Sequence, residues 1–306
     1  MRIIFGDTLV RLGGRNNDIV VLTADVAKPT NTNKFAETYP DRFLNVGISE
    51  QDMVGIAAGL ALSGKVPVVA VFASFLMRAW EQIRNTVARA DLNVKMVGTH
   101  AGLTSADDGS SHQALEDVAV MRVIPRMTVV VPGDRQEIAE ATEAIVEHRG
   151  PAYLRLGRDE EPKLFEGENV FKLGRAVTVR DGYDVAVFSN GAVTSEVLAA
   201  ASRSKVSTKV VHVPTVKPLD RDAIVAAARA TGVVVCAEEH SVIGGLGGAI
   251  AEVLSTEYPV YIRRIGTEDV FGESGSHSDL LRKHGLTADH IGAVLEEVQR
   301  RRAHCS

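Results

Sequence analysis

The chain has 306 residues, a net charge of −5 and 45% hydrophobic residues, which is enough for two domains of ordinary size. It has no Lys/Arg-rich stripe and no apolar stretch of roughly 18–20 residues, so we expect neither nucleic-acid binding nor a membrane span. The two cysteines, Cys236 and Cys305, indicate no disulfide framework and are typical of a cytoplasmic protein.

Residues 1–14 have the pattern of an amphipathic helix, and short apolar runs then alternate with helical periods. Helices are predicted at 50–63, 75–90 and 134–148, the last with Asp134 as its N-cap. The apolar runs are nearly continuous, as in strands that are buried on both faces of a parallel sheet. The predicted strands are 19–25, 43–47, 66–74, 94–100, 127–133 and 152–157.

A polar stretch, 158–172, separates this unit from a second unit of alternating strands and helices. We therefore predict two consecutive α/β domains, at 1–160 and 175–306, joined by a linker at 161–174. The second domain is predicted to contain strands at 185–191, 206–213, 233–240 and 258–266, and helices at 192–203, 220–230, 244–256 and 287–302.

Polar and aromatic residues collect where the strands of the first domain end. Ligands of open α/β sheets bind beyond the carboxyl ends of the strands, so these residues mark a candidate site. The strand-end residues are Asp25, Glu50, Phe72, Phe75, His100 and Arg158.

Glu50 stands between an apolar run that ends at Gly47 and an apolar helix. One interpretation is a carboxylate that is favoured by the positive end of the helix dipole. The other is a partly desolvated carboxyl group that transfers protons, and the apolar flanks favour it.

The stretch THAGLTSADDGSSHQ, 99–113, holds two histidines and two aspartates in a predicted loop. A metal site is one interpretation, with His100, Asp107 or Asp108, and His112 as ligands. Because no pair has the HxxxH spacing of a helical zinc site, we prefer a polar substrate pocket in which the histidines hold hydroxyl groups and move protons.

Two further segments have a functional and a structural interpretation. Phe72, Phe75 and Arg78 are either core aromatics with a surface arginine, or a wall for a flat heterocycle with the arginine at its edge. The glycines at 244–248 resemble a dinucleotide loop, but the acidic residue expected about 20 positions later is missing. We therefore interpret these glycines as close helix–sheet packing.

Five motifs together resemble the C-terminal half of a transketolase, and the resemblance covers essentially the whole chain. It implies a thiamine diphosphate pyrimidine-binding domain with a parallel sheet, followed by a transketolase C-terminal-type domain. The 1-deoxyxylulose-5-phosphate synthases share much of the pattern, and the beta subunits of 2-oxo-acid dehydrogenases share it more distantly. The motifs are NVGISEQ with the following AAGLA, FASFLMRAWEQIRN, DDGSSHQALED, LRLGRD and EEHSVIGGLGGA.

The resemblance assigns roles around thiamine diphosphate. In the family, the glutamate at the position of Glu50 hydrogen-bonds the aminopyrimidine ring and promotes removal of the thiazolium proton. Phe72 and Phe75 match the aromatics that stack on the ring, and Asp25 matches an acid near the thiazolium. Arg78 stands where many transketolases have tyrosine and where the synthases often have arginine.

The resemblance also assigns substrate-binding residues. His100, Asp108 and His112 match donor- and acceptor-sugar positions, and Arg2 and Arg158 match two phosphate-binding arginines, with a lesser contribution from the Thr30 hydroxyl. Ala101 follows His100 where many transketolases have aspartate, so the sugar is expected to differ from the usual pentose phosphates.

One family feature is absent: the GDG motif, which binds magnesium and the diphosphate, does not occur in this sequence. The resemblance therefore implies a split transketolase, in which a separate N-terminal subunit carries GDG and the magnesium ligands, in an α2β2 assembly. Alternatives are a synthase of the deoxyxylulose type, a 2-oxo-acid dehydrogenase beta subunit, and a scaffolding or regulatory paralogue without activity.

Overall fold

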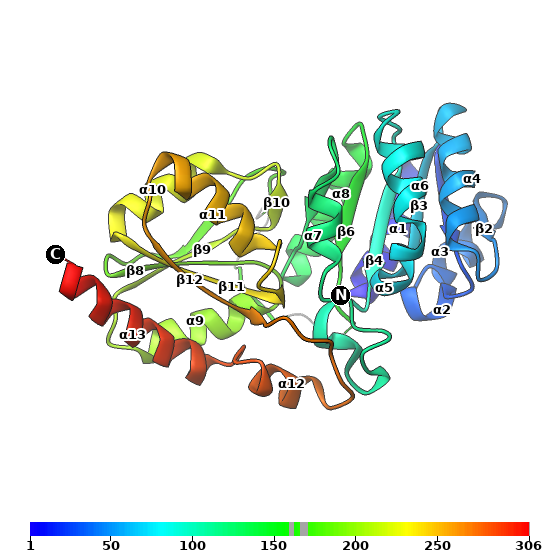
Figure 1. The fold of residues 1–306 in the computed structure, drawn as a ribbon. Coiled ribbons are helices and arrows are strands. Elements are labelled where there is room, and N and C mark those ends of the chain that lie inside the picture. The colour runs from blue at the N-terminus through cyan, green and yellow to red at the C-terminus, as the bar shows by residue number, and fades with distance from the viewer. Residues whose placement is uncertain (159–161, 166–170, 306) are drawn as a thin grey trace.

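The computed structural model describes residues 1–158, 162–165 and 171–305, which form two α/β units side by side (Figure 1). Among the described residues, the first unit has a seven-stranded sheet in the order β10-β5-β6-β4-β3-β1-β2. Six of these strands are parallel. The parallel strands are β1 (Ile19–Thr23), β2 (Phe43–Asn45), β3 (Val66–Phe72), β4 (Lys95–Thr99), β5 (Thr128–Val130) and β6 (Ala152–Arg155).

Five of the parallel strands, β1, β3, β4, β5 and β6, are buried on both faces, as their continuous apolar runs predicted. The edge strand β2 is instead largely exposed, because a neighbouring strand pairs with it on one side only. Helices α1 (Arg2–Arg15) and α8 (Arg135–Glu147) pack on one face, with α1 burying Phe5 and Leu9. Helix α4 (Glu50–Leu62) packs on the other face through Met53 and Ala57. The shorter helices of this unit are α2 (Ala27–Thr30), α3 (Asn33–Thr38), η1 (Pro40–Arg42) and α7 (Asp117–Arg122).

Two segments differ from the sequence-based prediction. The single helix predicted at 75–90 is broken into α5 (Ala73–Leu76), a 3-10 turn η2 (Met77–Ala79), α6 (Trp80–Gln82) and a π-helical segment η3 (Ile83–Ala88). The predicted loop after His100 contains a 3-10 segment, η4 (Gly102–Asp108). Apolar spacing over one turn does not distinguish 3-10, α and π hydrogen bonding, so the sequence pattern missed these changes.

The second unit has a five-stranded sheet among the described residues, in the order β12-β11-β8-β9-β7. The predicted strands and helices are present, whereas β7 and α12 were not predicted. No helix of the described chain is long and apolar enough to cross a membrane. The elements are β7 (Val177–Arg180), β8 (Val185–Ser189), α9 (Val193–Arg203), β9 (Thr208–His212), α10 (Arg221–Thr231), β11 (Val233–Ser241), α11 (Leu246–Glu257), β12 (Tyr261–Thr267), α12 (His277–Lys283) and α13 (Ala288–Cys305).

Strand β10 (Thr215–Lys217) was also missed, and it joins the two units. It follows β9 of the second unit along the chain but pairs antiparallel with β5 of the first. Part of the predicted linker, at 161 and 166–170, lies outside the described residues. On either side, the backbone N–H of Leu164 donates to Asp134, and that of Phe171 donates to Glu140. The described parts of the connection are therefore anchored to the α8 region.

A second connection between the units is a buried ionic network. Arg155 at the end of β6 donates through Nε to both carboxylate oxygens of Asp117, at 3.1 and 2.8 Å. Tyr153 donates to the same carboxylate at 2.6 Å. A guanidinium nitrogen of Arg155 also donates to the carbonyl oxygen of Glu239 in β11, at 2.9 Å. Because Asp117 is fully buried, its charge depends on these donors.

The glycine-rich start of α11 serves helix packing, as the sequence predicted. A Cβ at Gly247 would lie 3.0 Å from the Arg264 side chain and 3.3 Å from Cys236. The carboxylate of Glu238 accepts hydrogen bonds from Leu246 N and Gly247 N, at 2.6 and 2.8 Å. Glu238 therefore occupies the helix N-terminus where a dinucleotide loop would bind phosphate.

Lys95 is an unexpected fully buried charge in β4. Its ammonium donates to Asn93 Oδ1 and to the carbonyl oxygens of His148 and Gly150, at 2.6, 2.6 and 2.8 Å. Burial lowers the pKa of Lys95 from 10.5 to about 7. Above pH 7 the unfolded chain therefore retains a proton that the folded chain has lost.

Lys95 should accordingly make the protein more stable as the pH rises from 7 to 8.5. The unfolding free energy gains up to about 1.4 kcal/mol per pH unit from this group, because the cost of burying the charged form is relieved. Urea unfolding at pH 7, 7.75 and 8.5 measures this slope, and Lys95→Met should flatten it. An unchanged slope in the variant would show that Lys95 does not titrate in this range.

Candidate active site

The predicted site residues lie at the carboxyl edge of the first sheet, where the six parallel strands end (Figure 1). Asp25 follows β1 and His100 follows β4, and both have left-handed backbones, with φ of 61° and 55°. Left-handed conformations are uncommon outside glycine and concentrate where function fixes the backbone. The sheet edge is therefore the first place to look for chemistry.

Glu50 is the first residue of α4, and its side chain is only 5% exposed. Gly47 precedes it with φ of 74°, which turns the chain from β2 toward the helix. Arg78 donates to Glu50 Oε1 at 2.7 Å from a side chain that is 54% exposed. The buried carboxyl group is therefore oriented by a cation at its outer side.

A cluster of rings adjoins this carboxyl–guanidinium pair through Phe75. Phe72 stacks on Phe75 at a centroid distance of 5.1 Å and on His100 at 3.8 Å. His112 meets the Phe75 ring edge-on at 5.2 Å, and the Arg78 guanidinium lies 4.7 Å from the centre of Phe75. The structure thus brings together residues from β3, α5 and both ends of the 100–112 segment.

Hydroxyl groups that the sequence analysis did not identify hold the two imidazoles. Thr99 Oγ1 lies 3.0 Å from His100 Nδ1, and Ser111 Oγ lies 2.9 Å from His112 Nδ1. Ser105 Oγ bonds the backbone carbonyls of both His100 and His112, at 2.8 and 3.1 Å. The signal available in the sequence was the number of hydroxyl residues within THAGLTSADDGSSHQ.

Asp25 has one partner that the sequence analysis also missed. Its backbone N–H donates to Asn45 Oδ1 at 2.9 Å, and Asn45 Nδ2 donates back to Asp25 Oδ1 at 3.2 Å. Asn45 is the last residue of β2, which lies beside β1. The pair fixes the carboxylate of Asp25 at the sheet edge.

The proposed phosphate ligands lie along the same edge. Arg2 donates to the carbonyl oxygen of Pro29 at 2.7 Å, and Arg158 forms an ion pair of 3.4 Å with Asp108. Met1 contacts Gly157 N through its sulfur, which brings the start of α1 to the end of β6. Arg2 and Arg158 therefore belong to one region of the surface.

Thr30, which was predicted to help bind the substrate, is not exposed at the site. Its side chain is fully buried, and its hydroxyl bonds the carbonyl oxygen of Val26 at 2.8 Å and Thr32 Oγ1 at 3.0 Å. In this arrangement Thr30 stabilises the turn that carries Pro29, the partner of Arg2.

The alternative metal site in the 99–113 segment does not form in this arrangement. Within the part of the chain that the structure describes, no three His, Cys, Asp or Glu side chains gather as metal ligands. His100 stacks on Phe72, and Asp108 pairs with Arg158 instead.

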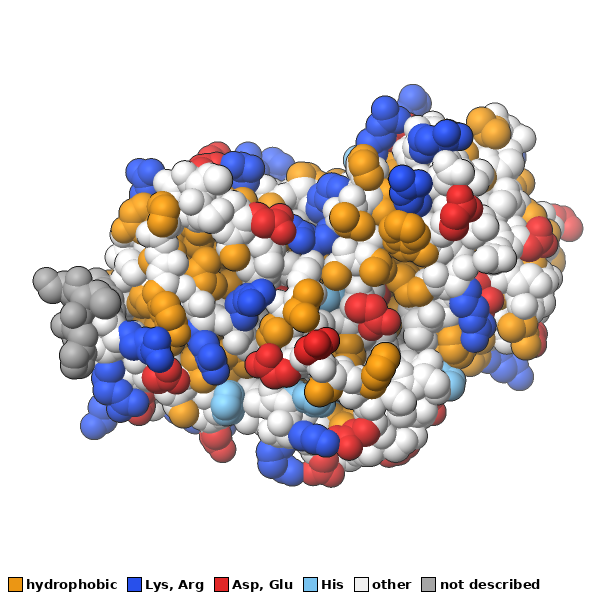
Figure 2. Space-filling view, in the orientation of Figure 1, with side chains coloured by type: hydrophobic (Ala, Val, Ile, Leu, Met, Phe, Trp, Pro, Cys, Tyr) orange, Lys and Arg blue, Asp and Glu red, His pale blue; other side chains and the backbone are white. Residues whose placement is uncertain are grey.

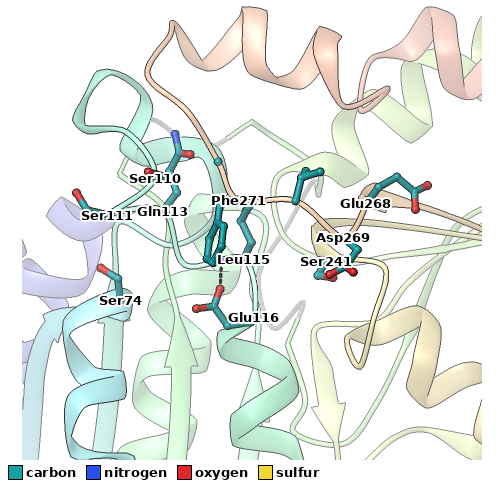
Figure 3. A pocket seen from close by; sticks show the side chains of 12 residues that line it. Ser74, Ser110, Ser111, Gln113, Leu115, Glu116, Ser241, Glu268, Asp269 and Phe271 are labelled. Carbon is teal, nitrogen blue, oxygen red and sulfur yellow. Dashed lines mark hydrogen bonds between the residues drawn. The ribbon is translucent and has the colours of Figure 1, made fainter.

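A cavity of about 440 Å³ lies beside this site, between the two units (Figure 3). Ser74 and Ser111, the sequence neighbours of Phe75 and His112, line one side of the cavity, Glu268 lines the other, and Phe271 lies between them (Figure 3). Acidic, hydrophobic and histidine side chains lie over this junction on the molecular surface (Figure 2). The cavity therefore lies next to the site residues, without Glu50 in its lining.

Two family models match this chain. Residues 1–163 match the transketolase pyrimidine binding domain, and residues 174–291 match the transketolase C-terminal domain. The chain belongs to the transketolase family, as its motifs predicted.

Particular relatives match nearly the whole chain. A putative transketolase C-terminal section of Methanocaldococcus jannaschii is 41% identical, over 98% of this chain and 96% of that protein. The 6-deoxy-6-sulfo-D-fructose transketolase subunit SqwH of a Clostridium species is 40% identical, over 99% and 95%. A solved split gene transketolase, described as an inactive beta4 tetramer, is 44% identical, with a TM-score of 0.89 over 98% of this chain and 97% of that one.

Proposed function

We propose that this chain is the pyrimidine-binding subunit of a split, thiamine diphosphate-dependent transketolase of the cytoplasm. It would transfer a two-carbon ketol unit from a ketose phosphate to an aldose phosphate. The observation that carries the proposal is the buried Glu50 carboxyl, oriented by Arg78 beside the Phe75 ring, which His112 meets edge-on.

The chemistry of these side chains fits the pyrimidine half of the cofactor. A flat aminopyrimidine needs an aromatic face and a carboxyl group that exchanges a proton with a ring nitrogen. The half-buried Phe75 is the candidate for the stacking face, whereas Phe72 is 8% exposed and supports Phe75 from within. Asp25, fixed by Asn45, supplies a negative charge for the cationic part of the cofactor.

When bound, thiamine diphosphate supplies the nucleophilic carbon that carries the ketol unit. The chain's own residues would do the rest of the work on this side of the site. Glu50 accepts and returns a proton, and His100 and His112 bind sugar hydroxyls and move protons. Asp108 accepts hydrogen bonds from the sugar, and Arg2 and Arg158 bind its phosphate.

We further propose that a second polypeptide completes the cofactor site. The sequence has no GDG motif to bind magnesium and the diphosphate, and the relatives include proteins named as sections or subunits of transketolases. The solved split-gene relative is described as an inactive beta4 tetramer. We therefore expect an α2β2 assembly in which an N-terminal subunit holds Mg²⁺.

Cofactor titration tests this proposal. Thiamine diphosphate with magnesium is titrated calorimetrically into the chain alone, an N-terminal transketolase section alone, and their mixture. We expect saturable binding with the highest affinity in the mixture. Binding that is no tighter in a mixture that forms a complex would contradict a shared site.

Arg158→Gln should weaken recognition of the phosphate. The variant loses a guanidinium that binds a phosphate through two hydrogen bonds, so the KM of a phosphorylated aldose should rise by about tenfold with little change in kcat. The KM of the same aldose without phosphate should not change, and the exposed Arg180→Gln on β7 serves as the matched control. Equal effects on both aldoses would remove the phosphate role from Arg158.

A further inference from the structure

A carboxylate of the second unit reaches the segment that carries the two site histidines. Glu239 lies in β11 and is 8% exposed. Its Oε1 accepts a hydrogen bond from the backbone N–H of Leu103 at 2.7 Å. Leu103 is the second residue of η4, only three positions after His100. The contact therefore joins the C-terminal domain to the start of the site segment.

The Leu103 N–H depends on this carboxylate. It belongs to the first turn of η4, where backbone donors have no partner within the helix, and Leu103 is fully buried. A buried donor without a partner costs about 1–3 kcal/mol. Gly102 makes room for the contact, because a Cβ there would lie 2.4 Å from Glu239 Oε1.

The η4 segment that Glu239 bonds is itself hydrogen-bonded to the backbone of both histidines. Ser105, two residues beyond Leu103, is fully buried and bonds the backbone carbonyls of His100 and His112. Asp108 is the last residue of the same segment. The backbones of His100 and His112 are thus attached to the turn that Glu239 holds, and Asp108 follows it beyond a kink at Ala106.

Glu239 itself is fixed from two further sides. Arg155 donates to its backbone carbonyl at 2.9 Å, and Arg155 is anchored by the buried Asp117. His277 Nε2, in the first turn of α12, lies 3.3 Å from Glu239 Oε2. Helix α12 runs close to η4, below the junction of the two units (Figure 1). The carboxylate therefore has a defined position relative to both units.

We propose that Glu239 is a positioning residue through which the C-terminal domain sets the geometry of the sugar-binding segment 100–112. The role of Glu239 in sugar binding rests on the proposed function. The role of Glu239 in holding the segment 100–112 rests on the contacts of this chain alone. The two roles are tested by separate experiments.

Hydrogen exchange of the chain by itself tests the positioning role. In Glu239→Ala, the amide of Leu103 and peptides within 100–113 should exchange at least about tenfold faster, which is the effect expected from losing one charge-assisted hydrogen bond. Glu239→Gln keeps an acceptor oxygen and should restore most of the protection. The neighbouring Glu238→Ala is the matched control, because Glu238 bonds Leu246 N and Gly247 N instead. Unchanged exchange at Leu103 in Glu239→Ala would overturn the inference.

Kinetics of this chain reconstituted with an N-terminal subunit test the role of Glu239 in sugar binding. Glu239→Ala should lower kcat/KM for the sugars by about tenfold or more and leave the KM of thiamine diphosphate within about twofold, since Glu50 and its partner Arg78 lie on elements outside the 100–112 segment. Glu239→Gln should recover most of this loss, and Glu238→Ala should not reproduce it. An equal loss of cofactor affinity in Glu239→Ala, or the same sugar defect in Glu238→Ala, would indicate a general structural role. If the wild-type pair has no turnover, the proposed function fails, and the exchange experiment still decides the role of Glu239.

Discussion

Glu50→Ala should abolish ketol transfer by the reconstituted pair while the subunits still assemble. A positioned proton-transfer group contributes about 10²–10⁴-fold to a rate, so we expect a loss of at least about 100-fold. The Glu50 carboxyl is nearly buried and accepts a hydrogen bond from Arg78, so the substitution removes a positioned proton-transfer group from the site. Steady-state turnover and size-exclusion chromatography of the mixture measure the two properties.

The control for Glu50 is Asp52→Ala in the same first helical turn. Asp52 is exposed, so its removal tests the loss of negative charge near the helix N-terminus without touching the site. Asp52→Ala should retain nearly full turnover. Activity of Glu50→Ala close to that of the wild type would refute the role of Glu50 and favour a scaffolding protein.

Asp117→Ala should strongly destabilise the fold. It leaves the buried Arg155 guanidinium without its anionic partner and removes the acceptor of the Tyr153 hydroxyl. Breaking a buried ion pair on one side costs about 3–5 kcal/mol, a large part of the stability of most proteins. Urea unfolding followed by circular dichroism should show this loss as a lower midpoint.

An exposed ion pair provides the comparison for Asp117. Arg203 and Asp289 are 68% and 92% exposed and lie 3.3 Å apart. Asp289→Ala should therefore cost less than about 1 kcal/mol. If Asp117→Ala cost no more than Asp289→Ala, the buried network would not contribute to holding the two units together.

The sequence predicted the parts of the fold that depend on local patterns. Continuous apolar runs identified the six parallel strands, and Asp134 was correctly predicted as the N-cap of α8, where it accepts hydrogen bonds from Gln136 N and Glu137 N. Strand β10 escaped prediction because three residues carry little periodicity and its partner, β5, lies far away in the chain. The burial of Lys95 in an apolar strand was not predicted, because two of its three acceptors, the carbonyl oxygens of His148 and Gly150, come from a distant segment.

In the candidate site, too, the sequence predicted what depends on local patterns and missed contacts between distant segments. Because ligands of open α/β sheets bind beyond the carboxyl ends of the strands, the sequence alone predicted that Asp25, Glu50 and His100 lie at one edge of the sheet. The groups that orient them, such as Asn45 for Asp25, become visible only when neighbouring strands are placed side by side. Glu239 is 136 residues from Leu103, so no local pattern indicates that contact.

The most direct test of the account is a ketol-transfer assay with thiamine diphosphate and magnesium. The chain is assayed alone and together with an N-terminal transketolase section from the same source, with xylulose 5-phosphate as donor and ribose 5-phosphate as acceptor. A sulfonated ketose and pyruvate extend the donors, because one relative is named for a sulfofructose and the deoxyxylulose synthases share the motifs. We expect turnover of a ketose donor only in the mixture. Turnover by the chain alone would contradict the shared site, and consumption of pyruvate alone by the mixture would contradict ketol transfer.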